Sequence, residues 1–177
     1  MKAVKPIIAF FALAMAVALS GCLGGGGGGE DEPKYEIFQG EATYVGAGDG
    51  LAQATTETIT ASQPVTLDNS MITEITFTID VTDGDPDTNT DMVNEINILD
   101  SDGNSNILSG GATPYSQSTT ITWDGVNPMN NTWTVDFSVV IEGGDDRWIG
   151  PIFWIGTPDN GFQYSVAVNY TFMVPLE

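Results

Sequence analysis

The sequence predicts an all-β domain in which two antiparallel sheets pack into a β-sandwich of immunoglobulin-like or jelly-roll type. Apolar and polar residues alternate along several segments, and this period of two places successive side chains on opposite faces of a strand. Dipeptides that favour turns, such as Asp102-Gly103 and Asp124-Gly125, separate these segments. Beyond the N-terminal leader, no stretch keeps the helical spacing i, i+3, i+4, i+7 over three turns. Roughly seven to nine short strands in one domain are typical of two packed sheets.

The strand patterns, in chain order, lie at 36–45, 55–60, 65–68, 75–81, 94–99, 118–123, 133–141, 148–155 and 162–174. The alternation is longest in the last segment, where every even position from 162 to 174 carries an aromatic or branched apolar side chain. The segments 75–81 and 133–141 show the same pattern, whereas the other patterns are weaker. We therefore predict half-buried strands in which one face contacts the core and the other faces solvent.

The composition excludes several classes of function. The 177 residues contain 24 Asp plus Glu, only 4 Lys plus Arg, no His and one Cys. Without His, the chain alone cannot build Ser-His-Asp or Cys-His catalysis, or a His-bound zinc, copper or haem site. The excess of acid excludes nucleic acid as a partner, because binding of phosphate requires clustered Lys and Arg. A single Cys permits no intrachain disulfide bond. The sequence therefore favours a protein that is not an enzyme.

The N-terminus has the anatomy of a signal peptide. Lys2 and Lys5 precede an apolar run at 7–19, which as a helix would span about 20 Å and is too short for a membrane about 30 Å thick. The run ends in the residues Leu19-Ser20-Gly21-Cys22. These four residues resemble the lipobox of exported lipoproteins, which implies that residues 1–21 are removed and that Cys22 becomes the lipidated N-terminus. The two chains of such a lipid would give stable attachment to membrane lipid.

Residues 22–34 are predicted to form a flexible tether, because six consecutive glycines and a short acidic run cannot bury apolar surface. The glycine-rich spacer after the lipobox and the strongly acidic domain resemble surface lipoproteins of archaea. This resemblance implies an extracellular, lipid-anchored protein at the outer face of the cell membrane. Without residues 1–21, two cations (Lys34 and Arg147) remain against the same 24 acids, a formal charge of −22. Residues 35–177 then form a single sandwich domain.

The clearest candidate site is an acidic loop after the strand at 75–81. Its oxygen-bearing side chains occupy alternate positions: Asp83, Asp85, Asp87, Asn89 and Asp91, followed by Glu95. Calcium takes six to eight such oxygens, and the pattern resembles the start of a DxDxDG calcium loop. It departs from that loop in having Thr88 where glycine is expected, and the alternative is a solvated acidic loop. A second loop, 100–104, either lies close to the first or is a hairpin turn without metal.

Aromatic and glycosylation sites form a second group of candidates. Trp148 and Trp154 are candidates for a platform that stacks on sugar rings, with burial in the core as the alternative, whereas Trp133 is in phase with a core-facing strand. Asn130 and Asn169 begin N-x-[ST] motifs, which are acceptors for glycosylation. Asn169 falls on the polar face of its strand and is predicted to be the more accessible of the two.

These features favour a lipid-anchored, non-catalytic binding or structural module of the cell surface. Its partners would be membrane lipid through Cys22 and an envelope protein or glycan, with Ca²⁺ as a stabilising ion. One alternative is a small extracellular hydrolase of the glycosidase type, because a pair of carboxylates is the catalytic device that this composition allows. Another is a subunit of a surface filament or layer, which would require the strand 162–174 to lie at a sheet edge.

Overall fold

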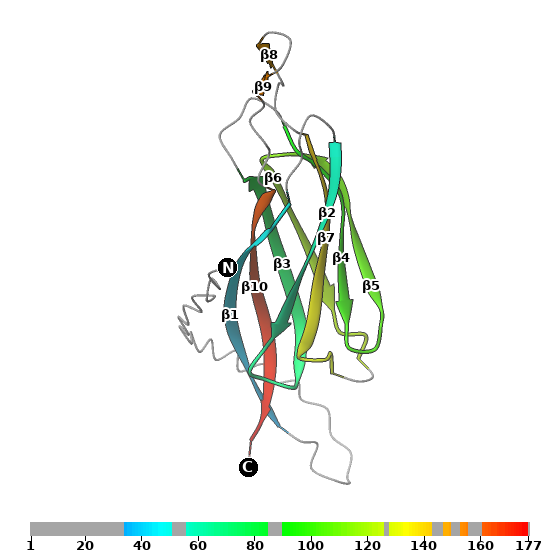
Figure 1. Cartoon of the computed structure of the whole chain (residues 1–177). Helices are drawn as coiled ribbons and strands as arrows, with labels where there is room; N and C mark the ends of the chain where they lie inside the picture. The colour runs from blue at the N-terminus through cyan, green and yellow to red at the C-terminus, as the bar shows by residue number, and fades with distance from the viewer. Residues whose placement is uncertain are drawn as a thin grey trace, which may run out of the picture.

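The computed structural model describes residues 34–50, 56–84, 90–125, 128–142, 147–149, 153–155 and 161–176, with only the backbone for 147–149 and 153–155. The strands are β1 (Tyr35–Gly48), β2 (Thr56–Thr66), β3 (Ile72–Asp83), β4 (Met92–Asp100), β5 (Ser105–Ala112), β6 (Tyr115–Thr122), β7 (Thr132–Glu142), β8 (Arg147–Ile149), β9 (Phe153–Ile155) and β10 (Phe162–Pro175). The predicted all-β class is confirmed (Figure 1). Within these ranges, no helix is long and apolar enough to span a membrane.

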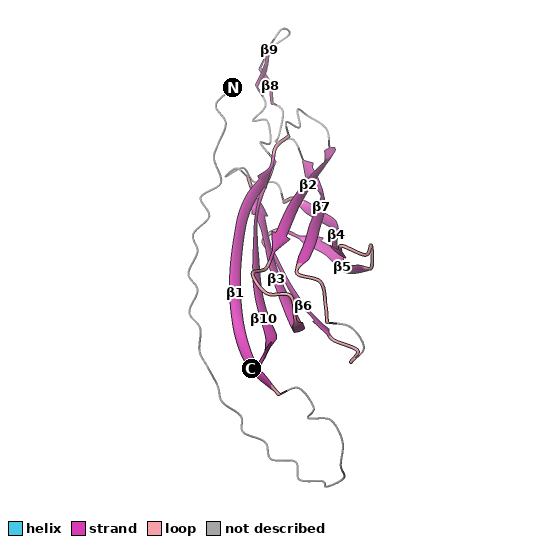
Figure 2. Ribbon diagram, turned by 90° about the horizontal axis from the view of Figure 1, so that it is seen from below, coloured by secondary structure: helices cyan, strands magenta, loops and turns pink. Residues whose placement is uncertain are grey.

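Eight strands form two antiparallel four-stranded sheets that pack face to face, a β-sandwich (Figure 2). The first sheet has the order β1-β10-β3-β6 and the second has the order β2-β7-β4-β5, while β8 and β9 form a separate hairpin. The pairs β1–β10, β2–β7, β3–β6 and β4–β5 are nested along the chain and alternate between the two sheets. This nesting is that of an eight-stranded jelly roll, so the strand order decides between the two predicted types of sandwich.

The structure corrects the predicted strands in three places. The segments 55–60 and 65–68 belong to one strand, β2, which continues through Pro64. A strand at a sheet edge tolerates proline because one side of its backbone has no partner, and β2 is an edge strand. The prediction missed β5, whose only fully buried apolar side chain is Leu108. The segment 148–155 contains two short strands rather than one.

The strand 162–174 lies inside its sheet and not at an edge. It corresponds to β10, which pairs with β1 on one side and with β3 on the other. The edge that a filament or surface layer would have used is therefore not provided by this strand.

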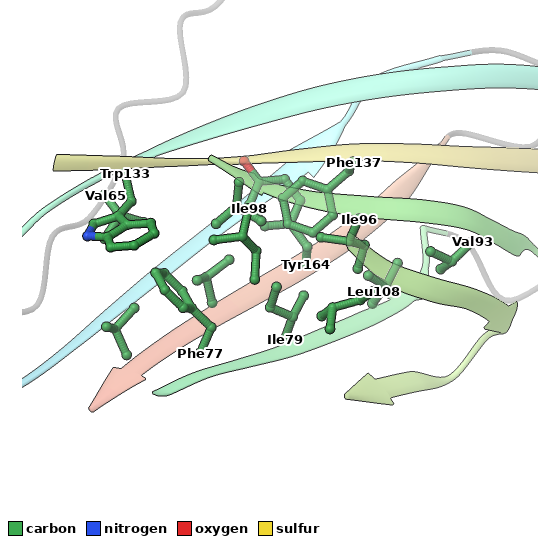
Figure 3. Packing of buried hydrophobic residues seen from close by; sticks show 14 of the residues in the cluster. Val65, Phe77, Ile79, Val93, Ile96, Ile98, Leu108, Trp133, Phe137 and Tyr164 are labelled. Atoms are coloured by element: carbon green, nitrogen blue, oxygen red, sulfur yellow. The ribbon is translucent and has the colours of Figure 1, made fainter. Parts of the chain in front are cut away.

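The core lies between the two sheets and is built by the predicted alternation. Along β7 every second residue, from Trp133 to Ile141, is buried. Phe137 stacks on Tyr164 of the opposite sheet with ring centroids 4.2 Å apart, and Trp133 meets Phe77 edge-on at 5.6 Å (Figure 3). Trp133 is 4% exposed, so its predicted place in the core is confirmed.

The inner face of β1 is lined by glycine at three positions, each opposite an aromatic residue of β10. Gly40 pairs with Tyr170, Gly46 with Tyr164 and Gly48 with Phe162. A Cβ atom added at any of the three would overlap the opposing ring. The rings of β10 thus fill the space that side chains of β1 would otherwise occupy, and β1 requires glycine there.

Candidate functional site at the loop end of the sandwich

The antiparallel strands give the sandwich two distinct ends. At the end that we call the loop end, the chain passes through 49–55, 84–91, 113–114 and 143–161. At the opposite end, the tether end, β1 begins after Lys34, β10 finishes at Pro175, and the chain passes through 67–71, 101–104 and 123–131. The β8–β9 hairpin lies at the top of Figure 1 and the C-terminus lies at the bottom. The acidic loop and the two candidate tryptophans therefore belong to the same end.

Three glycines join the strand ends at the loop end. The N–H of Gly84 donates a hydrogen bond to the carbonyl oxygen of Gly161 at 2.9 Å, and Gly161 has a φ of 91°. A Cβ atom on Gly84 would collide with the carbonyl of Gly161, and one on Gly161 would collide with the carbonyl of Gly48. The ends of β1 and β3 and the start of β10 thus meet backbone to backbone, which only glycine permits. This junction fixes where three of the loops begin or end.

The acidic loop is fixed at its far end by Asp91. The carbonyl oxygen of Asp91 accepts hydrogen bonds from the backbone N–H of Thr113 at 2.9 Å and from the Thr113 hydroxyl at 3.3 Å. Asp91 is 1% exposed, which is uncommon for an aspartate. These contacts attach the start of β4 to the turn between β5 and β6. The C-terminal end of the acidic loop is therefore held in place by Thr113.

The structure describes three of the six residues predicted to bind calcium. Asp83 is half-buried at the end of β3, Asp91 is buried, and Glu95 is exposed on β4 just after the pairing register shifts between Val93 and Glu95. Asp85, Asp87 and Asn89 lie outside the described residues. Within the described part of the chain, no three Asp or Glu side chains are grouped closely enough to hold a metal ion. The calcium site therefore remains a prediction that depends on residues 85–89.

The second acidic loop is a hairpin turn and does not approach the first. Residues 101–104 connect β4 to β5 at the tether end, and the nine residues of β4 place the two loops about 30 Å apart. One carboxylate oxygen of Asp100 accepts hydrogen bonds from the N–H groups of Asp102 at 2.9 Å and Asn104 at 2.8 Å. The other accepts a bond from the Asn104 amide at 2.8 Å, and Gly103 adopts a φ of 85°. The hairpin alternative is confirmed, and the alternative in which the two loops lie close together is wrong.

Asp100 should stabilise this hairpin in its ionised form. Partial burial acts to raise the pKa of Asp100, but the hydrogen bonds from Asn104, Asp102 and Gly103 together outweigh it and lower the pKa. We expect Asp100→Ala to lower the free energy of unfolding by about 1 kcal/mol at pH 7. Because the folded-state pKa is the lower one, this contribution is present above the unfolded-state pKa and is lost as the pH falls through the folded-state pKa. Urea unfolding of both proteins at pH 7 and at pH 3 measures it, and a difference that does not shrink at the lower pH would contradict this explanation.

The predicted stacking residues come together in the β8–β9 hairpin. The backbone of Trp148 pairs directly with that of Trp154, and Arg147 pairs with Ile155. The side chains of these residues lie outside the described part of the structure. The other predicted tryptophan, Trp133, is in the core and plays no part at this end.

The two glycosylation motifs differ in accessibility. Asn169 is exposed on the outer face of β10. Asn130 is half-buried at the tether end, and its amide donates a hydrogen bond to the carboxylate of Asp102 at 2.7 Å. Asn169 is thus the more accessible of the two, as its strand phase predicts.

No protein-family model and no curated protein matches the chain. Among solved structures, one similar fold is TmCBM61 in complex with β-1,4-galactotriose, which is 10% identical over 79% of this chain and 82% of that chain, with a TM-score of 0.32. Another comes from work on carbohydrate-binding modules of the β-sandwich superfamily, at 12% identity over 82% of this chain and a TM-score of 0.22. The match spans 57% of the length of that second chain. At these values neither likeness carries an argument about ligands.

Proposed function

We propose that the protein is a non-catalytic binding module, held at the outer face of the cell membrane by a lipid on Cys22, that presents its loop end to the cell envelope. One observation supports this most directly: the predicted tether enters the domain at Lys34 at one end, whereas the acidic loop and the β8–β9 hairpin leave at the opposite end. A tether fixed in the membrane therefore directs these two features outward.

The loop end suits a neutral polysaccharide. Asp49 and Glu142 are exposed there, so their carboxylate oxygens can accept hydrogen bonds from sugar hydroxyls. The negative charge repels anionic polymers. Trp148 and Trp154 are the stacking residues predicted from the sequence, and the apolar face of an indole ring matches the C–H face of a sugar ring.

Binding is favoured over hydrolysis by the distribution of the described carboxylates. A glycosidase needs two carboxyl groups whose pKa values are pushed apart by their surroundings. Asp100 has a lowered pKa, and the hydrogen bonds of a turn at the tether end account for that shift. This carboxyl group therefore serves a turn and does not point to hydrolysis at the loop end.

The anchor is tested by Cys22→Ser. The wild-type protein should partition into the detergent phase and sediment with membranes, and the variant should lose nearly all of this association because it carries no lipid. Ser20→Ala, which keeps a small residue before the cysteine, should behave like the wild type. Membrane association of Cys22→Ser at the wild-type level would point instead to an uncleaved N-terminal helix.

The binding end is tested in the same soluble Cys22→Ser background with the neutral polysaccharide fraction of the host envelope. Trp148→Ala combined with Trp154→Ala should abolish the retardation of the protein in an affinity gel containing that polysaccharide. Tyr35→Ala, which removes an aromatic ring at the tether end that is 40% exposed, should leave the retardation unchanged. Equal retardation of all three proteins would contradict binding at the loop end.

We also propose that the acidic loop binds Ca²⁺ and thereby orders the loop end. Calcium at about 100 times its dissociation constant should raise the melting temperature by about 5–10 °C, more than the same concentration of Mg²⁺, because an oxygen-rich loop suits the larger ion. Asp85→Ala with Asp87→Ala should remove the part specific to calcium. If Ca²⁺, Mg²⁺ and NaCl of the same ionic strength raised the melting temperature equally, charge screening alone would explain the rise, and the proposed calcium site would be contradicted.

A further inference from the structure

The strands β1 and β10 extend beyond the rest of the sandwich at the tether end. The pairing of β10 with β3 stops at Phe172 and Ile72, whereas its pairing with β1 continues to Pro175 and Tyr35. The N–H of Leu176 then donates a hydrogen bond to the carbonyl oxygen of Lys34 at 2.8 Å. Apart from a hydrogen bond from the N–H of Met173 to the carbonyl oxygen of Met71 at 2.9 Å, residues 34–37 and 173–176 form a two-stranded ribbon about 10–13 Å long, which we call the ribbon end. The lower ends of β1 and β10 in Figure 1 show it.

Exposed apolar side chains gather on this ribbon end. Of the seven large hydrophobic side chains that are exposed in the described part of the chain, four lie here: Tyr35 at 40%, Ile37 at 56%, Val174 at 39% and Leu176 at 48%. The other three are spread singly over β1, β4 and β5. A single exposed apolar side chain is ordinary, but a cluster of them marks a surface that contacts something other than water.

The ribbon end is continuous with aromatic residues on the inner face of the sheet. Phe38 and Phe172 are half-buried, and their rings stack with centroids 5.7 Å apart and an interplanar angle of 23°. Phe172 also lies 5.7 Å from the ring of Tyr170. Tyr35 and Ile37 lie on the outer face of the ribbon, whereas Val174 and Leu176 lie on the same face as Phe38 and Phe172. The ribbon end therefore presents apolar side chains on both faces, one of which continues into these packed rings.

The length of the preceding chain indicates what covers this surface. Eleven residues lie between Cys22 and Lys34, and the tether predicted from the sequence would span on the order of 20 Å. If the lipid of Cys22 lies in the membrane, the ribbon end is the part of the described domain that the tether reaches first. Tyrosine and aliphatic side chains beside a lysine are typical of the membrane interface, where apolar bodies enter the lipid and polar groups remain in water.

We infer that the ribbon end rests in the interfacial layer of the membrane that carries the Cys22 lipid. This inference rests on the anchor of the proposed function. Within the ribbon end, Lys34 and Glu36 offset each other, so the contact is apolar rather than electrostatic. It should therefore form on zwitterionic lipid and persist in high salt, although the whole domain is strongly acidic. A second contact point beside the lipid holds the sandwich upright, with its loop end pointing away from the membrane.

The test uses the full-length lipidated protein in phosphatidylcholine vesicles, with single cysteines labelled by an environment-sensitive fluorophore. Ile37→Cys reports on the ribbon end. Val45→Cys is the matched control, because Val45 is 58% exposed, lies on the same face of β1 and is about 27 Å farther from the tether. Ile107→Cys, also at a residue 58% exposed, reports on the second sheet. Unchanged melting temperatures of the unlabelled variants verify that they fold.

We expect the label at position 37 to emit at shorter wavelength and to be quenched several-fold more by a lipid-borne quencher than the labels at positions 45 and 107. The difference should be unaffected by 1 M NaCl, at which the screening length is about 3 Å. Equal emission and quenching at all three positions would overturn the inference. A shift at position 37 that vanishes when the protein is diluted at constant lipid would also overturn it, because a second copy of the chain would then cover the ribbon end.

The same experiment separates failure of the anchor from failure of the contact. In the wild-type protein Cys22 is the only cysteine, and a lipidated thiol takes up no label. Labelling of the wild-type protein would overturn the anchor, and with it the placement of the ribbon end. An unlabelled wild type together with equal signals at positions 37 and 45 would overturn the membrane contact alone.

Discussion

Gly46→Val is expected to lower the free energy of unfolding by about 3 kcal/mol, because the new side chain enters space already filled by Tyr164. The tyrosine ring cannot move aside without losing the contacts that hold it in place. It stacks on Phe137 with centroids 4.2 Å apart, and its hydroxyl donates a hydrogen bond to the Gln63 side-chain oxygen at 3.3 Å. Urea unfolding measures the change.

The matched control for this prediction is the neighbouring residue. Ala47 points outward from β1 and is exposed, so Ala47→Val should be neutral or slightly stabilising, since valine favours strands. In a Tyr164→Ala background the cost of Gly46→Val should fall sharply, because the obstructing ring is gone. If Gly46→Val and Ala47→Val changed the free energy of unfolding equally, the contact between the glycines of β1 and the rings of β10 would not explain why β1 requires glycine.

The sequence predicted most clearly the strands with large apolar side chains on their buried face, and it predicted the others weakly or, for β5, not at all. The segments 75–81, 133–141 and 162–174 correspond to β3, β7 and β10, because large apolar residues occupy every inward position. In β1 the inward positions include glycines whose space is filled by rings of β10, so the strand shows little alternation of its own. The alternation of apolar and polar residues is weak in β5 for a related reason, since Leu108 is the buried apolar side chain of that strand.

The arrangement of the candidate sites depends on strand pairing, which hydrophobic alternation does not specify. A single strand between two loops places them at opposite ends of a sheet, and β4 separates the two acidic loops in this way. That consequence could have been drawn from the predicted strand 94–99 alone. The ribbon end could not have been predicted in this way, because Ile37 and Met173 come from the two ends of the domain and become neighbours only when β1 pairs with β10.

Phe137→Ala is expected to lower the free energy of unfolding by about 3–5 kcal/mol, a large part of the roughly 5–15 kcal/mol that stabilises a typical domain. Phe137 is 1% exposed, stacks on Tyr164 and lies 6.1 Å from the ring of Phe162, so it connects the two sheets at the centre of the core. Removing the ring leaves a cavity that neither sheet can fill without separating from its partner strands. Equilibrium unfolding in urea, followed by tryptophan fluorescence, measures the loss.

Phe38→Ala makes the same chemical change at the ribbon end, and we expect it to cost only about 1 kcal/mol, because Phe38 is half-buried and contacts mainly Phe172. The contrast bears on function. If the ring contributes little to folding in solution, the aromatic residues next to the predicted tether are available for another contact, such as the membrane contact inferred above. A loss at Phe38 as large as that at Phe137 would instead make the ribbon part of the core, and its exposed apolar side chains would then need no partner.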